Sequence, residues 1–273
     1  MPAASVAIIA GAGHFPFHVV QEAKRQGVPA IVIGLQGWAD PSLAKQVEVY
    51  EELAVGQLSR LIATLKSHRV DRAILAGKVT KEILLDQRVA FDAEARGILS
   101  QATDASVAAL LGAVAQRLAS EGITLLDSST FLQANLCPGG TLTSRAPTAI
   151  EQEDIRIGVQ AARAIAALDI GQTVVVKRRV IVAVEALEGT DAAIRRAHAL
   201  AGEGLVVVKT ASPNQDRRFD LPIVGMDTMA TLKEMRVSCL AVEAGATLLL
   251  ERDAMLSTAN AASICLIGIT IPS

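Results

Sequence analysis

The residues best suited to chemistry in this 273-residue chain lie between 180 and 228, at the ends of two apolar runs. The first run, 180–184, ends at Glu185, and Glu188-Gly189-Thr190-Asp191 then opens a segment with helical periodicity. Thr190 or Asp191 can cap that helix, and the first N–H groups of a helix form a site suited to an anion. We therefore expect an anion site at the end of this run.

The second run ends at Lys209 and leads into a polar loop that carries an acidic pair, Asp216 and Asp220. Hard cations such as Mg²⁺ take carboxylate and phosphate oxygens together. An acidic pair beside lysine and arginine suits displacement at phosphorus, because the metal and the cations neutralise the transferring phosphoryl group. The two aspartates are four residues apart and can approach one site. The alternative is that they only pair with Arg217 and Arg218.

The elements that must position these residues begin with a Rossmann-like domain, residues 1–132. Strands alternate there with helices, which predicts a parallel sheet with right-handed crossovers. We expect strands at 5–10, 30–33, 46–50, 72–76 and 123–126, and helices at 17–26, 57–68 and 102–121.

Gly11 and Gly13 close the first expected strand in the turn GAGHFP, and Gly77 and Lys78 close the fourth. Parallel sheets bind ligands at the carboxyl ends of their strands, so we expect these residues at one edge, together with Asp127, which follows the fifth expected strand. The turn is not a full dinucleotide fingerprint, because Pro16 replaces the third glycine and no acid directly follows the second strand. A turn for the phosphate or sugar of a nucleotide fits better. The alternative for Lys78 is a solvated loop lysine.

Residues 133–150 are rich in Pro, Gly, Ser and Thr and predict a linker, in which Thr143 could itself touch a ligand. Residues 151–273 predict a second, mixed α/β domain. Its expected helices are 151–168, 191–200, 228–235 and 252–262, and its expected strands are 174–176, 180–184, 205–208, 237–242, 247–251 and 263–271. The interpretation we favour for the turn Lys177-Arg178-Arg179 is a solvated hairpin tip, with contact to anionic lipid as the alternative.

Composition excludes several classes of protein. A net charge of −2 argues against nucleic acid as a partner. The three cysteines show no metal spacing, and we expect Cys239 and Cys265 in the core. The odd cysteine count and the lack of a signal peptide indicate the cytoplasm. No apolar run reaches the ~18 residues that span a bilayer. The chain contains neither GxSxG nor a Walker A motif.

Six motifs make the sequence resemble a known family. They are GAGHFP, GKVTK, PGGTLT, VIVAVEALEGTD, KTASPNQDRRFDLPIVGMDTM and EAGATLLLERD, and they extend from residue 6 to about 269. The family is the metal-dependent UDP-2,3-diacylglucosamine pyrophosphatase of bacterial lipid A biosynthesis, the type unrelated to calcineurin-like phosphoesterases. Departures are small: Ser212 stands in place of a Lys-rich KPxQD context, and His14 occupies a variable turn position.

The resemblance implies two α/β domains that hold the substrate between them. It implies Mg²⁺-dependent hydrolysis, in which water attacks the uridine-side phosphorus and yields UMP and 2,3-diacylglucosamine 1-phosphate. The aspartate on which the family depends falls on Asp220. A lipid substrate also implies peripheral contact with the cytoplasmic face of the inner membrane. The oligomeric state stays undecided, with a homodimer as one alternative.

Two rival functions stay open: a non-catalytic sugar-nucleotide binding protein and, less favoured, a Rossmann-type oxidoreductase. The predicted catalytic residues are Asp220, Asp216 and Asp191, of which Asp220 and Asp216 would bind the metal. The predicted substrate-binding residues are Gly11, Gly13, Gly77, Lys78, Thr143, Glu188, Gly189, Thr190, Lys209 and Gln215.

Overall fold

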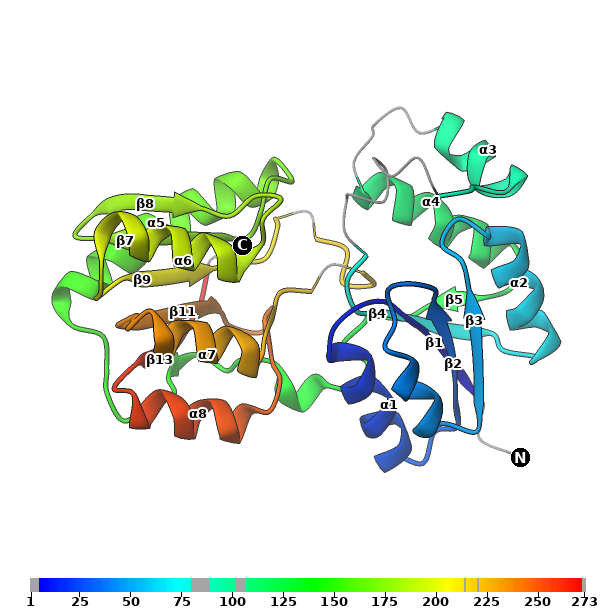
Figure 1. The fold of residues 1–273 in the computed structure, drawn as a ribbon, viewed down its shortest axis with the longest axis horizontal. Helices are drawn as coiled ribbons and strands as arrows, with labels where there is room; N and C mark the ends of the chain where they lie inside the picture. The colour runs from blue at the N-terminus through cyan, green and yellow to red at the C-terminus, as the bar shows by residue number, and fades with distance from the viewer. Residues whose placement is uncertain (1–4, 80–88, 102–106, 214, 220, 272–273) are drawn as a thin grey trace. The chain divides into compact units, whose positions relative to one another are not determined.

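The structure is a computed structural model that describes residues 5–79, 89–101, 107–213, 215–219 and 221–271. The chain forms two compact units, Met1–Leu132 with Asp216–Phe219 and Gln133–Gln215 with Asp220–Ser273. Each unit has its own sheet and core (Figure 1). The predicted fold class, a parallel-sheet domain followed by a mixed α/β domain, is confirmed.

The first unit contains a five-stranded parallel sheet in the order β3-β2-β1-β4-β5, which matches the first five strands of the doubly wound order 3-2-1-4-5-6. Its strands are β1 Val6–Ala10, β2 Ala30–Leu35, β3 Val49–Leu53, β4 Arg72–Ala76 and β5 Thr124–Leu125. The β1 sequence VAIIA is buried throughout, as expected for a parallel strand covered on both faces. The carboxyl ends of all five strands therefore meet at one edge.

Helices cover both faces of this sheet (Figure 1). Helix α1 (Phe15–Arg25) packs on β1, β2 and β4. Helices α2 (Leu58–Ser67) and α4 (Val107–Ser120) form a core with Ile9 and Ile33, while α3 (Ala93–Gln101) packs on both of these helices. Successive strand residues point to opposite faces, so Ile8 and Val32 face α1. A 3₁₀ helix, Pro41–Lys45, follows β2.

The second unit contains a six-stranded mixed sheet in the order β6-β13-β11-β9-β7-β8. Strands β9, β11 and β13 are parallel, while β6, β7 and β8 pair antiparallel with their neighbours. The strands are β6 Gly140–Thr141, β7 Thr173–Lys177, β8 Val180–Val184, β9 Val206–Lys209, β11 Cys239–Glu243 and β13 Cys265–Ile269. Strand β8 is one edge of this sheet.

Two apolar cores fill the second unit. Helix α5 (Ala149–Ala167) packs on β7 and β9 and contributes Ile155 to one core. Helices α6 (Thr190–Ala201), α7 (Met226–Glu234) and α8 (Arg252–Ala261) contribute to the other. Cys239 and Cys265 are fully buried neighbours in register, so their prediction as core residues is confirmed.

Several segments differ from the predicted elements. Residues 133–150, expected as a linker, lie in the second unit, where a short 3₁₀ helix (Gln133–Asn135) precedes β6, and β6 pairs with β13. The strand expected at 247–251 is only β12 (Leu248–Leu249), which pairs with β10 (Ile223–Val224) outside the main sheet. A strand of only two residues is too short to leave an alternating pattern of apolar and polar residues in the sequence. Within the described residues, no helix is both long and apolar enough to cross a membrane.

Candidate active site

The charged cluster expected around Lys209 lies at one edge of the second sheet. Lys209 ends β9 and stands opposite Thr173, which begins the antiparallel strand β7. Glu185 follows the end of β8, and Thr190 begins α6. The mixed topology therefore brings residues from four segments to the same edge.

The four side chains of this lysine cluster, Lys209, Glu185, Thr173 and Thr190, are joined by hydrogen bonds. Lys209 Nζ donates to Thr190 Oγ1 at 2.9 Å and to Thr173 Oγ1 at 3.3 Å. Thr190 Oγ1 donates to Glu185 Oε1 at 2.7 Å, and the other carboxylate oxygen lies 3.9 Å from Nζ. Only 9% of the Lys209 side chain and 12% of the Glu185 side chain are exposed. A buried charge pair of this kind persists because each charge is compensated.

The surroundings keep Glu185 ionised. Burial by itself raises the pKa of this carboxyl. The Lys209 ammonium, the hydroxyls of Thr173 and Thr190, and the N–H of Gln172 oppose that effect, and together they hold the pKa below its ordinary value. The edge thus presents a fixed carboxylate and a fixed ammonium in a largely dry environment.

Four polar atoms in the same unit are buried without a hydrogen-bond partner among the described residues: Asp191 Oδ1, Thr210 Oγ1, Gln215 Nε2 and Thr247 Oγ1. Thr210 directly follows Lys209, and Asp191 directly follows Thr190, so two of these atoms adjoin the lysine cluster in sequence. Buried polar groups are normally satisfied, and an unsatisfied one is a candidate contact for a ligand.

Other predicted residues of this unit have different surroundings. Gly189 caps α6 at φ +82, a left-handed conformation suited to glycine, and supplies no capping side chain. The carboxylate of Glu188 accepts a hydrogen bond from the Arg196 guanidinium at 2.5 Å. Thr143 lies near the opposite edge, at the amino end of β13. Its hydroxyl accepts from Leu266 N and donates to Arg145 O, each at 3.0 Å, so the structure does not bring it to the lysine cluster.

In the first unit, the two glycine turns meet at the carboxyl edge of the sheet. Ala12 and Lys78 exchange two backbone hydrogen bonds of 2.9 Å. A Cβ on Gly11 would lie 2.6 Å from the Lys78 carbonyl oxygen, and Gly77 has φ +94. Neither position accepts a larger residue without a backbone shift. Lys78 is exposed, and Gly13 (φ +91) stands in open space just before α1.

The acidic loop contributes a four-residue segment, 216–219, to the first unit. Arg217 Nε donates to Asp127 Oδ2 at 2.7 Å, and Ser128 N donates to the carbonyl of Arg217 at 2.9 Å. Asp216 is engaged by Arg218, whose Nε and Nη2 lie 2.5–3.0 Å from its carboxylate oxygens. This contact lowers the pKa of Asp216. The alternative of pairing with arginine thus holds for Asp216, while Asp220 lies outside the described residues.

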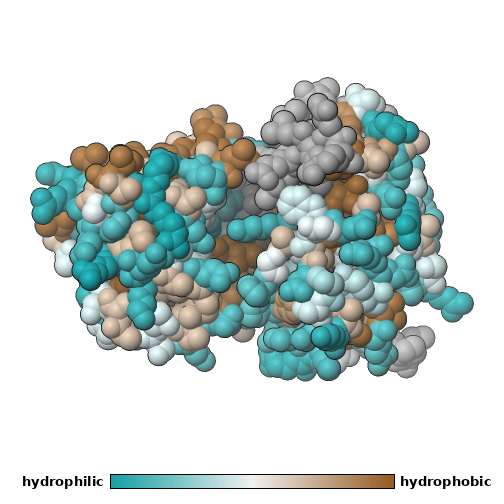
Figure 2. Space-filling model, in the orientation of Figure 1, coloured by the Kyte–Doolittle hydropathy of each residue, from teal (hydrophilic) through white to brown (hydrophobic). Residues whose placement is uncertain are grey.

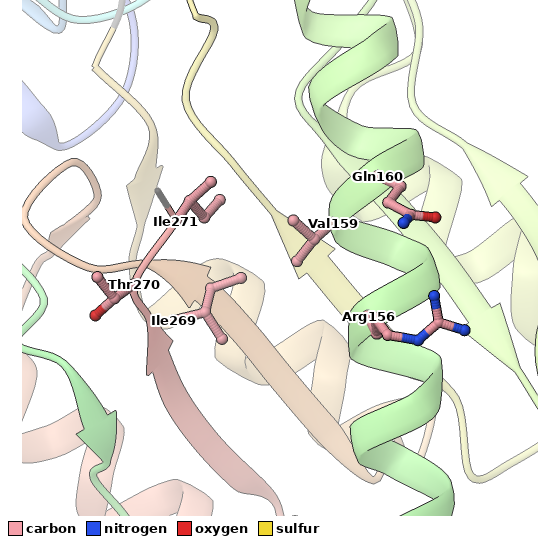
Figure 3. Close-up of a pocket in the computed structure, with 6 residues that line it drawn as sticks. All are labelled: Arg156, Val159, Gln160, Ile269, Thr270 and Ile271. Atoms are coloured by element: carbon pink, nitrogen blue, oxygen red, sulfur yellow. The ribbon is translucent and has the colours of Figure 1, made fainter. Parts of the chain in front are cut away.

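A metal-binding group is absent from the part of the chain that the structure describes, where no three His, Cys, Asp or Glu side chains gather. A pocket of about 330 Å³ opens between α5 and the end of β13. Val159 points toward Ile269 and Ile271 there, while the Arg156 side chain points away from them (Figure 3). The pocket contains none of the predicted site residues and no acid.

Sequence reasoning placed Glu185 in the charged cluster and Asp127 at the carboxyl edge of the first sheet, because each follows an apolar strand, but it predicted neither as a catalytic or binding residue. Arg217 was considered only as an ion-pair partner of the two aspartates, and Thr173 was not considered. Position at a strand end was the signal available for Glu185 and Asp127. Thr173 carried no signal, because its role depends on the antiparallel pairing of β7 with β9.

Comparison with known proteins adds independent information. Residues 5–135 match the family described as the LpxI N-terminal domain, and residues 138–267 match the LpxI C-terminal domain. A protein of Caulobacter vibrioides named UDP-2,3-diacylglucosamine pyrophosphatase LpxI is 28% identical over 275 residues, which cover 96% of each chain.

Solved structures give weaker likenesses. The biotin carboxylase domain of Hydrogenobacter thermophilus 2-oxoglutarate carboxylase is 11% identical at a TM-score of 0.28, over 72% of this chain and 41% of that one. The biotin carboxylase subunit of a pyruvate carboxylase is 13% identical at a TM-score of 0.26, over 73% and 42%. The chain spans about two fifths of the length of these carboxylases. Similarity at this level supports no inference about function.

Proposed function

This chain belongs to the LpxI family, and from that premise we propose that it hydrolyses the pyrophosphate bond of UDP-2,3-diacylglucosamine in lipid A biosynthesis. The products would be UMP and 2,3-diacylglucosamine 1-phosphate, formed when water attacks the uridine-side phosphorus. The observation that carries the proposal is the match to both LpxI domain families, over residues 5–135 and 138–267. The name of the Caulobacter relative supplies the substrate.

The lysine cluster supports a role in binding phosphate. Lys209 presents an ammonium whose position is fixed by Thr190, Thr173 and Glu185. A fixed cation needs no rearrangement when negative charge develops on a phosphoryl oxygen, and the dry surroundings strengthen the attraction.

The glycine turns of the first unit support a nucleotide seat. Gly11 and Gly77 allow the two turns to pack backbone against backbone, which fixes this edge beside the start of α1, and α1 begins without a side-chain cap. The N-terminus of a helix favours a phosphate group. We propose that this edge takes the uridine nucleotide, with Lys78 as an exposed cation beside it.

The Mg²⁺ requirement rests on the family resemblance of the run RFDLP. The described residues do not form a metal site by themselves. Both carboxylate oxygens of Asp216 bind Arg218, and no group of three His, Cys, Asp or Glu side chains among the described residues could hold a metal ion. Asp220, with Asp216, is the proposed metal ligand. When bound, Mg²⁺ would supply charge neutralisation at the pyrophosphate.

The test is release of UMP from UDP-2,3-diacylglucosamine, measured with Mg²⁺ and with EDTA, for the wild type and for Asp220→Ala. We expect activity that EDTA abolishes. In the variant we expect activity to fall by about a thousandfold or more while the substrate still binds, because removal of a group that stabilises the transition state affects turnover.

Each other outcome points elsewhere. A wild type that binds the nucleotide lipid without turnover, at any metal concentration, would identify a sugar-nucleotide binding protein. Equal activity of wild type and Asp220→Ala would contradict the role of Asp220 and turn attention to Asp191 and Asp216. Activity that persists in EDTA would contradict the proposed requirement for Mg²⁺.

We also propose that the protein works in the cytoplasm, at the inner face of the inner membrane, where a diacylated substrate resides. A homodimer is the oligomeric state that we would test first. Equilibrium sedimentation that gives the mass of a single chain at every concentration would contradict the dimer.

A further inference from the structure

We propose that the hairpin formed by β7 and β8 docks the protein on an anionic lipid surface. The contact is a hairpin patch, which consists of Arg178, Arg179, Val180, Ile181 and Leu200. This inference goes beyond the proposed hydrolysis, because it concerns where the chain binds a bilayer and does not depend on turnover.

The tip of the hairpin is rigid. Arg178 and Arg179 have φ +48 and +67, the left-handed pair of a tight two-residue turn, and Lys177 pairs with Val180 across it. The carboxylate of Asp154, which is 2% exposed, accepts both arginine backbone N–H groups at 2.9 and 2.5 Å. Non-glycine residues seldom adopt this conformation, so the Asp154 contact holds the two side chains in one place.

The tip carries uncompensated positive charge. Lys177 Nζ donates a hydrogen bond of 2.6 Å to the carbonyl oxygen of Ala201, and this bond attaches the hairpin to the end of α6. Both arginines are exposed, and neither guanidinium forms an ion pair with any residue that the structure describes. Asp154 offsets one of the three cations, so a net charge of about +2 remains at the tip.

Apolar side chains flank these cations. Val180 is 63% exposed, Ile181 is 44% exposed and Leu200, in the last turn of α6, is 69% exposed. Val180 and Ile181 begin the edge strand β8 and point to its opposite faces. Figure 2 shows hydrophobic residues in brown at the upper edge of the second unit, where β8 runs in Figure 1.

The combination of charges and apolar groups favours lipid over a second copy of the chain. Exposed aliphatic groups beside unpaired arginines match a bilayer surface, where apolar groups enter the interface and cations meet anionic headgroups. A second copy that paired along β8 would offer no free acid from this edge. Glu185 already binds Lys209 and Thr190, and Glu188 already binds Arg196.

The experiment is co-flotation of the full chain with vesicles of phosphatidylcholine alone and of phosphatidylcholine with phosphatidylglycerol. We expect binding to the anionic vesicles only, and weaker binding at high salt because screening shortens the reach of the charges. Each basic residue near an anionic surface contributes about fivefold in affinity, so Arg178→Glu with Arg179→Glu should weaken binding by about 25-fold or more. Leu200→Ser should weaken it several-fold.

Two controls make the test specific. Lys24→Glu with Lys45→Glu, both exposed in the first unit, gives the same change in net charge and should bind as wild type. Leu168→Ser removes a side chain of matching exposure, 72%, at the far end of α5 and should also bind as wild type.

Several results would overturn the proposal. These are equal binding to neutral vesicles, equal losses in the control variants, or full binding by the double arginine variant with its circular dichroism unchanged. If the wild type ignores vesicles and Val180→Glu converts a dimer to a monomer in sedimentation, the edge is a self-association surface instead. The assay contains no substrate, so a failed activity test would leave this result intact.

Discussion

Lys209 and Glu185 illustrate how two buried residues depend on each other. An ammonium and a carboxylate this deep in the protein are each costly to bury alone, and the hydroxyls of Thr173 and Thr190 satisfy their remaining hydrogen-bonding groups. Removal of one charge leaves the other without a counter-charge, and that change typically costs about 3–5 kcal/mol in a buried pair.

Glu185→Gln and Lys209→Met should therefore each lower the free energy of unfolding by about 3 kcal/mol, and the double variant by clearly less than the sum. Urea denaturation of the four proteins measures this coupling. The pKa of Glu185 is held below its ordinary value, so its contribution is present at neutral pH and is lost as the pH falls through that lowered pKa. Additive losses in the cycle would show that the pair is not coupled.

At the scale of elements, α5 depends on its first turn. Thr148 and Glu151 form a capping box: Glu151 N donates to Thr148 Oγ1, and Thr148 N donates to Glu151 Oε2. The Glu151 carboxylate also accepts hydrogen bonds from two nitrogens of the Arg145 guanidinium, each at 2.8 Å. Burial alone would raise the pKa of Glu151, but Arg145, Thr148 and Ser238 lower it to about 2.

Glu151→Gln should lower the free energy of unfolding at pH 7 by about 3 kcal/mol, because lowering the pKa from 4.5 to about 2 is equivalent to about 1.4 kcal/mol for each pH unit. The folded-state pKa is depressed, so the contribution is complete above about 4.5 and disappears as the pH falls toward 2. Urea titrations at pH 7, 4 and 3 should show the wild type and the variant converging. A difference that is constant with pH would contradict the assignment. Glu153→Gln, on the exposed side of the same turn, is the matched control.

The sequence predicted the elements whose pattern is long and repeated. Strand β4 and the hairpin strand β8 have the predicted bounds, and α2 and α5 differ from prediction by one or two residues at each end. Each has an uninterrupted apolar run or a full amphipathic stripe, so local pattern and tertiary burial agree. Helix α3 left a weak pattern and was not predicted.

The candidate site was predictable only in part. Gly11, Gly77 and Lys209 follow apolar strands, and parallel topology alone brings such residues to a common edge. The partners of Lys209 could not be inferred in the same way, because Thr173 reaches it through an antiparallel pairing between strands that are distant in sequence. The pairing of Asp216 with Arg218 was an open alternative, since spacing does not decide between an ion pair and a ligand.

The chain path links the two units of the whole molecule three times. It leaves the first unit after Leu132, returns for Asp216–Phe219 and leaves again at Asp220. The short return makes contacts that the first unit cannot supply from its own 132 residues. Arg217 binds Asp127, and the backbone and hydroxyl of Ser128 bind the carbonyls of Arg217 and Arg218. The first unit is therefore complete only when the acidic loop is present.

This arrangement predicts that a fragment of residues 1–132 is less stable than the same unit within the full chain. The fragment loses the bonds to Asp127 and Ser128 and exposes the groups that made them, a loss of about 1–3 kcal/mol. Trp38 is the one tryptophan of the sequence and lies in the first unit, so its fluorescence during urea unfolding reports on that unit alone.

We expect a lower midpoint of the urea transition for the fragment than for the full chain, and an intermediate midpoint for full-length Arg217→Ala. Arg236→Ala, which removes an exposed pair with Glu203 in the second unit, should leave the Trp38 transition unchanged. Identical midpoints for fragment and full chain would mean that the return segment adds nothing to the first unit, and that Arg217 does not anchor the acidic loop.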